Sequence, residues 1–101
     1  MKNELKELQA KLRKAKKEKQ MITKRYTELF EAILKTKGIE LQETEYCDTV
    51  YGPASYIKTF EDVTIYLYPN MEEEKINVFS KGRSWRFNSL EPSLKLIESL
   101  H

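Results

Sequence analysis

Few side chains in this chain of 101 residues could carry out catalysis. The single cysteine, Cys47, has no internal histidine to act as its base, because the one histidine is the terminal His101. A thiol without an activating partner is most often a small buried residue. One Cys and one His also fall short of the ligand set of a zinc site. We therefore expect a non-enzymatic protein without a metal or a cofactor.

Three carboxylates, Glu43, Glu45 and Asp48, lie close together in the sequence. On a strand, Glu43 and Glu45 would share one face, and with Asp48 they could hold a divalent cation. A solvated strand face accounts for the same residues more simply, and we adopt that interpretation.

Aromatic rings and cationic side chains gather near the C-terminal half, where they could form a ligand or partner face. This set comprises Tyr66, Tyr68, Lys81, Arg83, Trp85 and Arg86. Rings beside guanidinium groups suit a nucleobase with its phosphate, and they suit a protein-binding hot spot equally well. The simpler alternative, which we favour, places Trp85 and Phe87 in the core, Arg86 at the surface and the tyrosines under a long helix.

The segment after Gly38 has the two-residue alternation of strands. It is clear in "VTIYLY", "KINVF" and "RSWRF", whereas residues 40–50 alternate poorly. Turn residues at 51–55, 60–62, 68–74 and 80–83 separate these runs by connections too short for parallel crossovers. We expect an antiparallel meander of four to five strands, followed by a short helix in "NSLEPSLKLIESL" that Asn88 or Ser89 caps.

Residues 1–37 predict one long amphipathic helix that ends at Gly38. Its apolar residues recur with heptad spacing, and the resulting seam contains Leu5, Leu8, Leu12, Ala15, Ile22 and Tyr26. A helix of roughly 50 Å exceeds the roughly 25–30 Å across a body built from residues 38–101. The fold class is therefore α+β in one domain, with a helix that extends beyond its body.

A second copy of the same helix is the cover that we expect for the seam. A parallel pairing would set Lys11 against Lys16 and Lys19 against Lys19, so an antiparallel dimer is favoured. The sequence thus predicts a homo-oligomer, with a dimer preferred.

Charge is divided along the chain. Residues 1–37 hold 12 Lys and Arg against 5 Glu, whereas residues 38–101 hold 6 Lys and Arg against 11 Asp and Glu. At about 100° per residue a basic row gathers on the side of the helix away from the seam, formed by Lys6, Arg13, Lys17 and Lys24. Such a row could follow a nucleic-acid backbone. Solvation of a helix surface explains it more simply, and contact with an acidic protein surface is a third interpretation.

These observations favour a non-enzymatic interaction protein that is oligomeric through its N-terminal helix and inhibits or modulates another macromolecule. In general character the chain resembles the small Lys-rich accessory proteins of phages and mobile elements. The alternatives are a nucleic-acid-binding protein that uses the basic row, and a protein that sequesters a small nucleotide. Without a membrane span or a signal peptide, a cytoplasmic location without membrane contact is expected.

Overall fold

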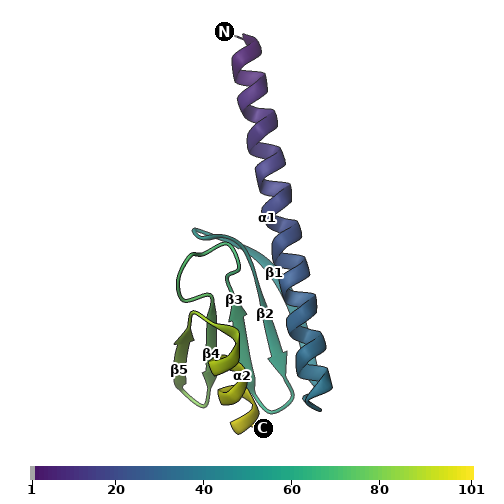
Figure 1. The fold of residues 1–101 in the computed structure, drawn as a ribbon, viewed down its shortest axis with the longest axis vertical. Helices are drawn as coiled ribbons and strands as arrows, with labels where there is room; N and C mark the ends of the chain where they lie inside the picture. The colour runs from purple at the N-terminus through teal and green to yellow at the C-terminus, as the bar shows by residue number, and fades with distance from the viewer. Residues whose placement is uncertain (1) are drawn as a thin grey trace.

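The computed structural model describes the backbone of residues 2–101 and the side chains of residues 3–101. A long helix is followed by five strands and a short helix, which confirms the predicted α+β class (Figure 1). The helices are α1 (Lys2–Thr36) and α2 (Leu90–Ser99); the strands are β1 (Leu41–Thr49), β2 (Gly52–Thr59), β3 (Val63–Leu67), β4 (Ile76–Ser80) and β5 (Arg83–Phe87).

The five strands form one antiparallel meander in the order β1-β2-β3-β4-β5. The least regular stretch, residues 41–49, is a nine-residue edge strand with a register shift between Leu41 and Glu43. The turn expected at 51–55 is wrong, because β2 already begins at Gly52. At the β4–β5 hairpin, Lys81 (φ 50°) and Gly82 (φ 76°) both adopt the left-handed conformation that a two-residue turn requires.

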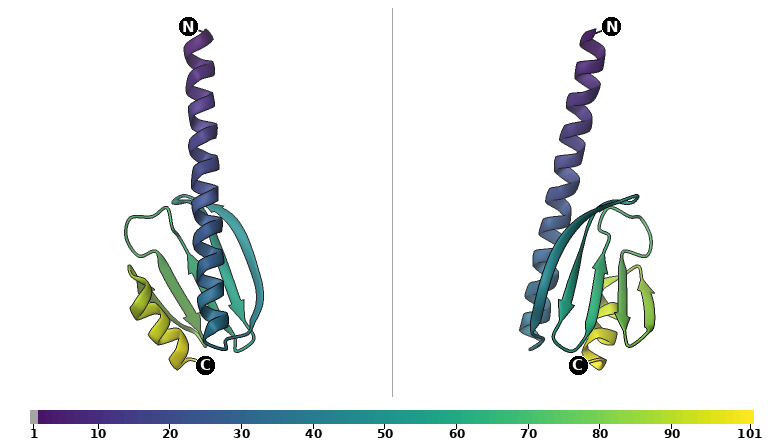
Figure 2. Two further views of the ribbon diagram at one scale, coloured as in Figure 1. Left: turned by 45° about the vertical axis from the view of Figure 1, so that its right-hand side comes forward. Right: turned by 180° about the vertical axis from the view of Figure 1, so that it is seen from behind.

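Both helices cover the same face of the sheet, and the other face is left open (Figure 2). Along each central strand, every second side chain points toward the helices and is buried. Side chains from α1 and α2 pack against them. The core comprises Phe30, Leu34, Ile39, Ile57, Val63, Ile65, Leu67, Ile76, Val78, Leu94 and Ile97. The molecule thus has two layers around one core.

Only the C-terminal half of α1 lies on the sheet. The helix has 35 residues, and the molecule measures 57 × 21 × 21 Å, so the N-terminal half projects well beyond the sheet (Figure 1). All residues from 3 to 22 are exposed, and the first buried residue of α1 is Thr23. The predicted overhang is therefore present in the structure.

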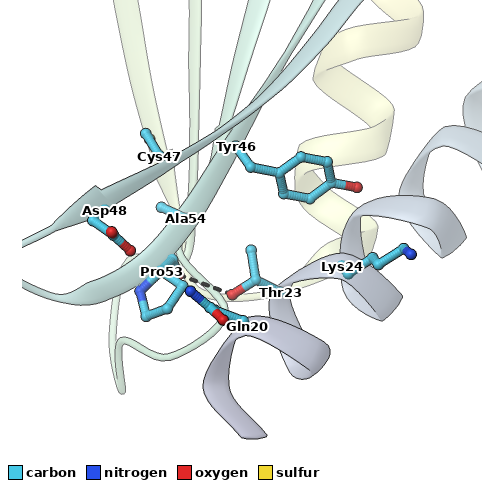
Figure 3. A pocket seen from close by; sticks show the side chains of 8 residues that line it. All are labelled: Gln20, Thr23, Lys24, Tyr46, Cys47, Asp48, Pro53 and Ala54. Atoms are coloured by element: carbon cyan, nitrogen blue, oxygen red, sulfur yellow. Dashed lines mark hydrogen bonds between the residues drawn. The ribbon is translucent and has the colours of Figure 1, made fainter. Parts of the chain in front are cut away.

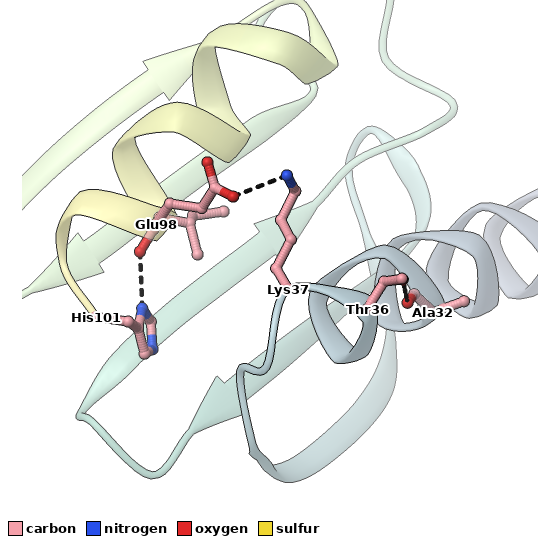
Figure 4. A network of polar contacts seen from close by, with 6 residues as sticks. Ala32, Thr36, Lys37, Glu98 and His101 are labelled. Carbon is pink, nitrogen blue, oxygen red and sulfur yellow. Dashed lines mark hydrogen bonds and ion pairs between the residues drawn. The ribbon is translucent and has the colours of Figure 1, made fainter.

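Helix α2 closes the other end of the covered face. Ser89 is its N-cap, but its side chain makes no capping hydrogen bond, so the expected side-chain cap is wrong. An ion pair of 2.8 Å joins Lys37, just after α1, to Glu98 of α2 (Figure 4). The His101 ring lies 2.7 Å from the Ile97 carbonyl oxygen and 2.9 Å from the Thr59 hydroxyl, so the last residue is held rather than frayed.

Candidate interaction surfaces

Most of the apolar seam of α1 is exposed to solvent. Leu5, Leu8 and Leu12 on the overhang are 62%, 56% and 69% exposed, and Ile22 and Leu29 beside the sheet are 52% and 51% exposed. Tyr26 and Ile33 on the same line are half-buried against the edge of the core. We call the residues Leu5, Leu8, Leu12, Ala15, Ile22, Tyr26 and Leu29 the α1 stripe. These five large apolar side chains follow a heptad seam that turns by about 120° around a straight helix between Leu5 and Leu29, and they form an extended exposed apolar surface.

The face of α1 that packs on the sheet is a different one. Its buried residues are Thr23, Thr27, Phe30 and Leu34. At about 100° per residue, the centre of this face lies about 120° around the helix from Ile22 and Leu29. Helix α1 therefore carries two contact faces, and its own sheet uses only one of them.

Polar contacts fix α1 on β2. The hydroxyl groups of Thr27 and Ser55 lie 2.6 Å apart in the buried layer, and the Thr23 hydroxyl donates to the Pro53 carbonyl oxygen at 2.9 Å. From the loop after β3, the Asn70 amide donates to the Thr23 hydroxyl at 2.9 Å and to the Pro53 carbonyl at 3.0 Å. Because buried polar groups need their partners, these contacts set the position of α1 along the sheet.

The basic row lies on the opposite side of α1 from the stripe, and all its members are exposed. This side of the helix is the one that faces β1. Lys24 lines a cleft with β1 residues, and Lys16 lies 3.9 Å from Asp48 at the end of β1. The row therefore runs from the free overhang toward an edge strand that carries Glu43, Glu45 and Asp48.

A cleft of about 460 Å³ separates α1 from β1 (Figure 3). Its walls combine the polar side chains of Gln20, Lys24 and Asp48 with the Tyr46 ring and the apolar surface of Pro53 and Ala54. Burial raises the pKa of Tyr46, and the nearby carboxylates Glu31 and Glu28 raise it further. Cys47 is exposed on β1, contrary to the buried position expected for it. The charged side chains of Asp48 and Lys24 line the cleft together with Cys47, so it is a groove of mixed polar and apolar character.

The open face of the sheet carries a cluster of aromatic rings. Tyr66 lies at its centre, with ring centroids 5.7 Å from Tyr56, 6.5 Å from Tyr68 and 5.2 Å from Phe79. Tyr51 extends the cluster by an edge contact with Tyr68 at 6.3 Å. Such cross-strand contacts stabilise the sheet, and they leave ring edges exposed on its open face.

One row of paired residues crosses all five strands on this face. It runs through Glu45, Tyr56, Tyr66, Asn77 and Arg86. The Tyr56 hydroxyl donates to Glu45 Oε2 at 2.7 Å, and this hydrogen bond is the main reason that the pKa of Tyr56 is raised to about 12. The row thus ends in a carboxylate at one edge and in a guanidinium at the other.

The predicted aromatic and cationic set does not form one site. Tyr66, Tyr68 and Arg86 belong to the open face, whereas Trp85 pairs with Val78 and Arg83 with Ser80 on the covered face. Lys81 lies in the β4–β5 turn. The favoured alternative is confirmed for Trp85 and Phe87, which pack against the core, and for exposed Arg86. It is wrong for the tyrosines, which lie on the face away from α1.

In the part of the chain that the structure describes, no group of three His, Cys, Asp or Glu side chains is placed to hold a metal ion. Among residues 2–101, neither helix is both long and apolar enough to cross a membrane.

The fold and its surfaces define a two-layer α+β protein with an extended helix. Comparisons with protein-family models, with curated protein sequences and with solved structures give no match to this chain.

Proposed function

We propose that the protein is a non-enzymatic dimer that acts by binding another macromolecule, with α1 as its dimerisation element. The observation that carries the proposal is the α1 stripe, in which Leu5, Leu8, Leu12, Ile22 and Leu29 are each more than half exposed. Apolar patches of this continuity are typical of surfaces that bind another protein.

The overhang supports the same proposal. Helices in water take most of their stability from packing of an apolar face, and isolated helices shorter than about 12–15 residues are marginal. Every side chain of α1 from residue 3 to residue 15 is exposed. A helix from a second copy would provide that packing and would remove the leucine side chains from water. Each leucine that becomes fully buried contributes roughly 1.5–3 kcal/mol relative to a fully exposed one, and somewhat less here because part is already covered.

The pair of substitutions Leu8→Glu and Leu12→Glu tests the dimer. Charges in the stripe should reduce the molar mass from twice 12.0 kDa to 12.0 kDa, while the sheet and its thermal transition stay as in the wild type. The matched control is Arg13→Glu with Lys17→Glu, which introduces carboxylates on the opposite side of the same helix segment and should leave the dimer intact. An unchanged mass for the stripe variant would remove the stripe from the proposal.

A nucleic-acid-binding function is the second candidate, and the full exposure of Lys6, Arg13 and Lys17 on one side of the overhang favours it. The control variant doubles as its test. If the row binds phosphates, Arg13→Glu with Lys17→Glu should weaken binding to any sequence and reduce the salt dependence of the affinity. Absence of a nucleic-acid mobility shift by the wild type at low salt would dismiss this candidate.

The third candidate, a site for a small nucleotide, is not supported by the positions of its residues. Arg83 lies on the face opposite Tyr66, so the rings and both arginines cannot surround one ligand.

A dimer through α1 leaves the open face of the sheet and the basic row accessible for a further partner.

A further inference from the structure

We infer that α1 pairs with α1 of a second copy in an antiparallel register that places Leu5 opposite Leu29, Leu8 opposite Tyr26 and Leu12 opposite Ile22. The inference rests on the proposed dimer and adds its geometry. Each chain's overhang would then lie along the half of α1 that is anchored to the partner's sheet.

The two halves of the stripe match in length. Leu5 and Leu12 bound the overhanging half, and Ile22 and Leu29 bound the half beside the sheet. Both intervals are seven residues, or roughly 10 Å along a helix. An antiparallel pair therefore covers both halves at once, and each unsupported segment meets one that the sheet already holds in place.

The one polar residue within the stripe also favours this register. Lys19 interrupts the heptad pattern, and in this register it lies opposite Ala15, the smallest side chain of the stripe. The lysine stem can then pass over Ala15 and carry its ammonium group to water. A parallel pair would instead place the two Lys19 side chains against each other.

Charge complementarity points the same way. Residues 1–19 hold 8 Lys and Arg against 3 Glu, whereas residues 38–101 hold 6 against 11 Asp and Glu. A parallel pair would bring the two basic overhangs together, while the antiparallel pair lays each overhang beside the acidic body of the partner. Like-charge contact is thereby exchanged for long-range attraction.

The packing of α1 leaves this side of the helix available. Its polar side faces β1, where Lys24 and Tyr46 line the cleft, and its buried face holds Thr27 and Phe30 on the sheet. Beside the sheet, Ile22 and Leu29 of the stripe stay more than half exposed. Farther toward the overhang, Leu12 and Ala15 border a shallow groove with Asp48 and Thr49 at the end of β1. A second helix can therefore reach the stripe beside the sheet at Ile22 and Leu29, and near Ala15 it would also contact the β1–β2 turn.

Cysteine cross-linking in a Cys47→Ser background tests the register, because Cys47 is the only native thiol. Leu12→Cys with Ile22→Cys in one chain should give a covalent dimer with a short bifunctional thiol reagent. Within one helix these positions are roughly 15 Å apart, too far for such a reagent. Leu12→Cys alone should stay uncross-linked in an antiparallel dimer, but it would cross-link to its own copy in a parallel one.

Spin labels on Lys6→Cys give a second measurement that leaves the stripe unaltered. The inferred register separates the two label sites by about 33 Å along the helix pair, whereas a parallel register sets them side by side. A dimer with adjacent labels, or with cross-linking through Leu12→Cys alone, would overturn the register and leave the proposed dimer standing. A monomeric wild type would overturn both.

Discussion

At the scale of single residues, the polar contacts under α1 determine where the helix lies. Phe30 and Leu34, the apolar residues beside the heptad seam, indicate part of the face that packs on the sheet. Thr23 and Thr27 complete this face but are not typical core residues, so the sequence does not indicate them. Their spacing with Phe30 and Leu34 is nonetheless that of a buried helical face, at intervals of four, three and four residues. This second periodicity was the signal in the sequence that could have added the two threonines to the buried face.

Replacing Thr27 by valine should lower the free energy of unfolding by about 1–3 kcal/mol. The substitution keeps the shape of the side chain but leaves the Ser55 hydroxyl buried without its partner at 2.6 Å. Urea denaturation measures the loss. Adding Ser55→Ala should recover part of it, because the orphaned group is removed.

The exposed Thr36, whose hydroxyl donates to the Ala32 carbonyl oxygen at 2.6 Å (Figure 4), provides the matched control. Thr36→Val should change the stability by less than about 0.5 kcal/mol. Equal losses at the two positions would show that the buried hydroxyl pair does not hold α1 on the sheet.

The Tyr56–Glu45 hydrogen bond predicts a pH dependence at the alkaline end. The pKa of Tyr56 is raised from 10.0 to about 12 in the folded protein. A raised pKa means that the folded state retains this proton more strongly, so the contribution is complete below pH 10 and is lost as the pH rises from 10 to 12.

NMR titration of the Tyr56 ring measures this pKa, and Tyr56→Phe identifies its signal. Glu45→Gln should shift the midpoint back toward 10, since the amide accepts the hydrogen bond without a negative charge. A midpoint that Glu45→Gln does not move would contradict the assigned cause.

At the scale of elements, the alternation of side chains along each strand and the pairing between strands decide which aromatic residues share one face of the sheet. The alternation in each strand correctly predicted the buried positions of β3 and β4, and short connections predicted the meander. The pairing register, however, was not available from the sequence. Trp85 therefore faces the core through its pairing with Val78, while Tyr66 faces outward next to Asn77.

The central position of Tyr66 predicts an unequal effect of two alanine substitutions on the open face. Tyr66 contacts three neighbouring rings, whereas Tyr51 contacts one and is 54% exposed. Tyr66→Ala should therefore cost about 1–3 kcal/mol of stability, and Tyr51→Ala less than about 1 kcal/mol. Thermal unfolding compares them. A larger loss for Tyr51→Ala would contradict the aromatic cluster as described.

At the scale of the whole molecule, the long helix and the division of charge follow from the sequence. Helix length, its end near Gly38 and the overhang could be predicted because α1 is longer than any body that 64 further residues can build. The angle between the stripe and the buried face of α1 could not, because it depends on how the helix packs on β2. That angle leaves Ile22 and Leu29 free beside the sheet and makes a reciprocal dimer possible.

The most direct test of the account is the absolute molar mass of the wild-type protein, measured by size-exclusion chromatography with light scattering at low and high salt. We expect twice 12.0 kDa at both, because salt screens the charges between the copies but does not weaken burial of the α1 stripe. A mass of 12.0 kDa at micromolar concentration would contradict the dimer and leave the stripe open in solution.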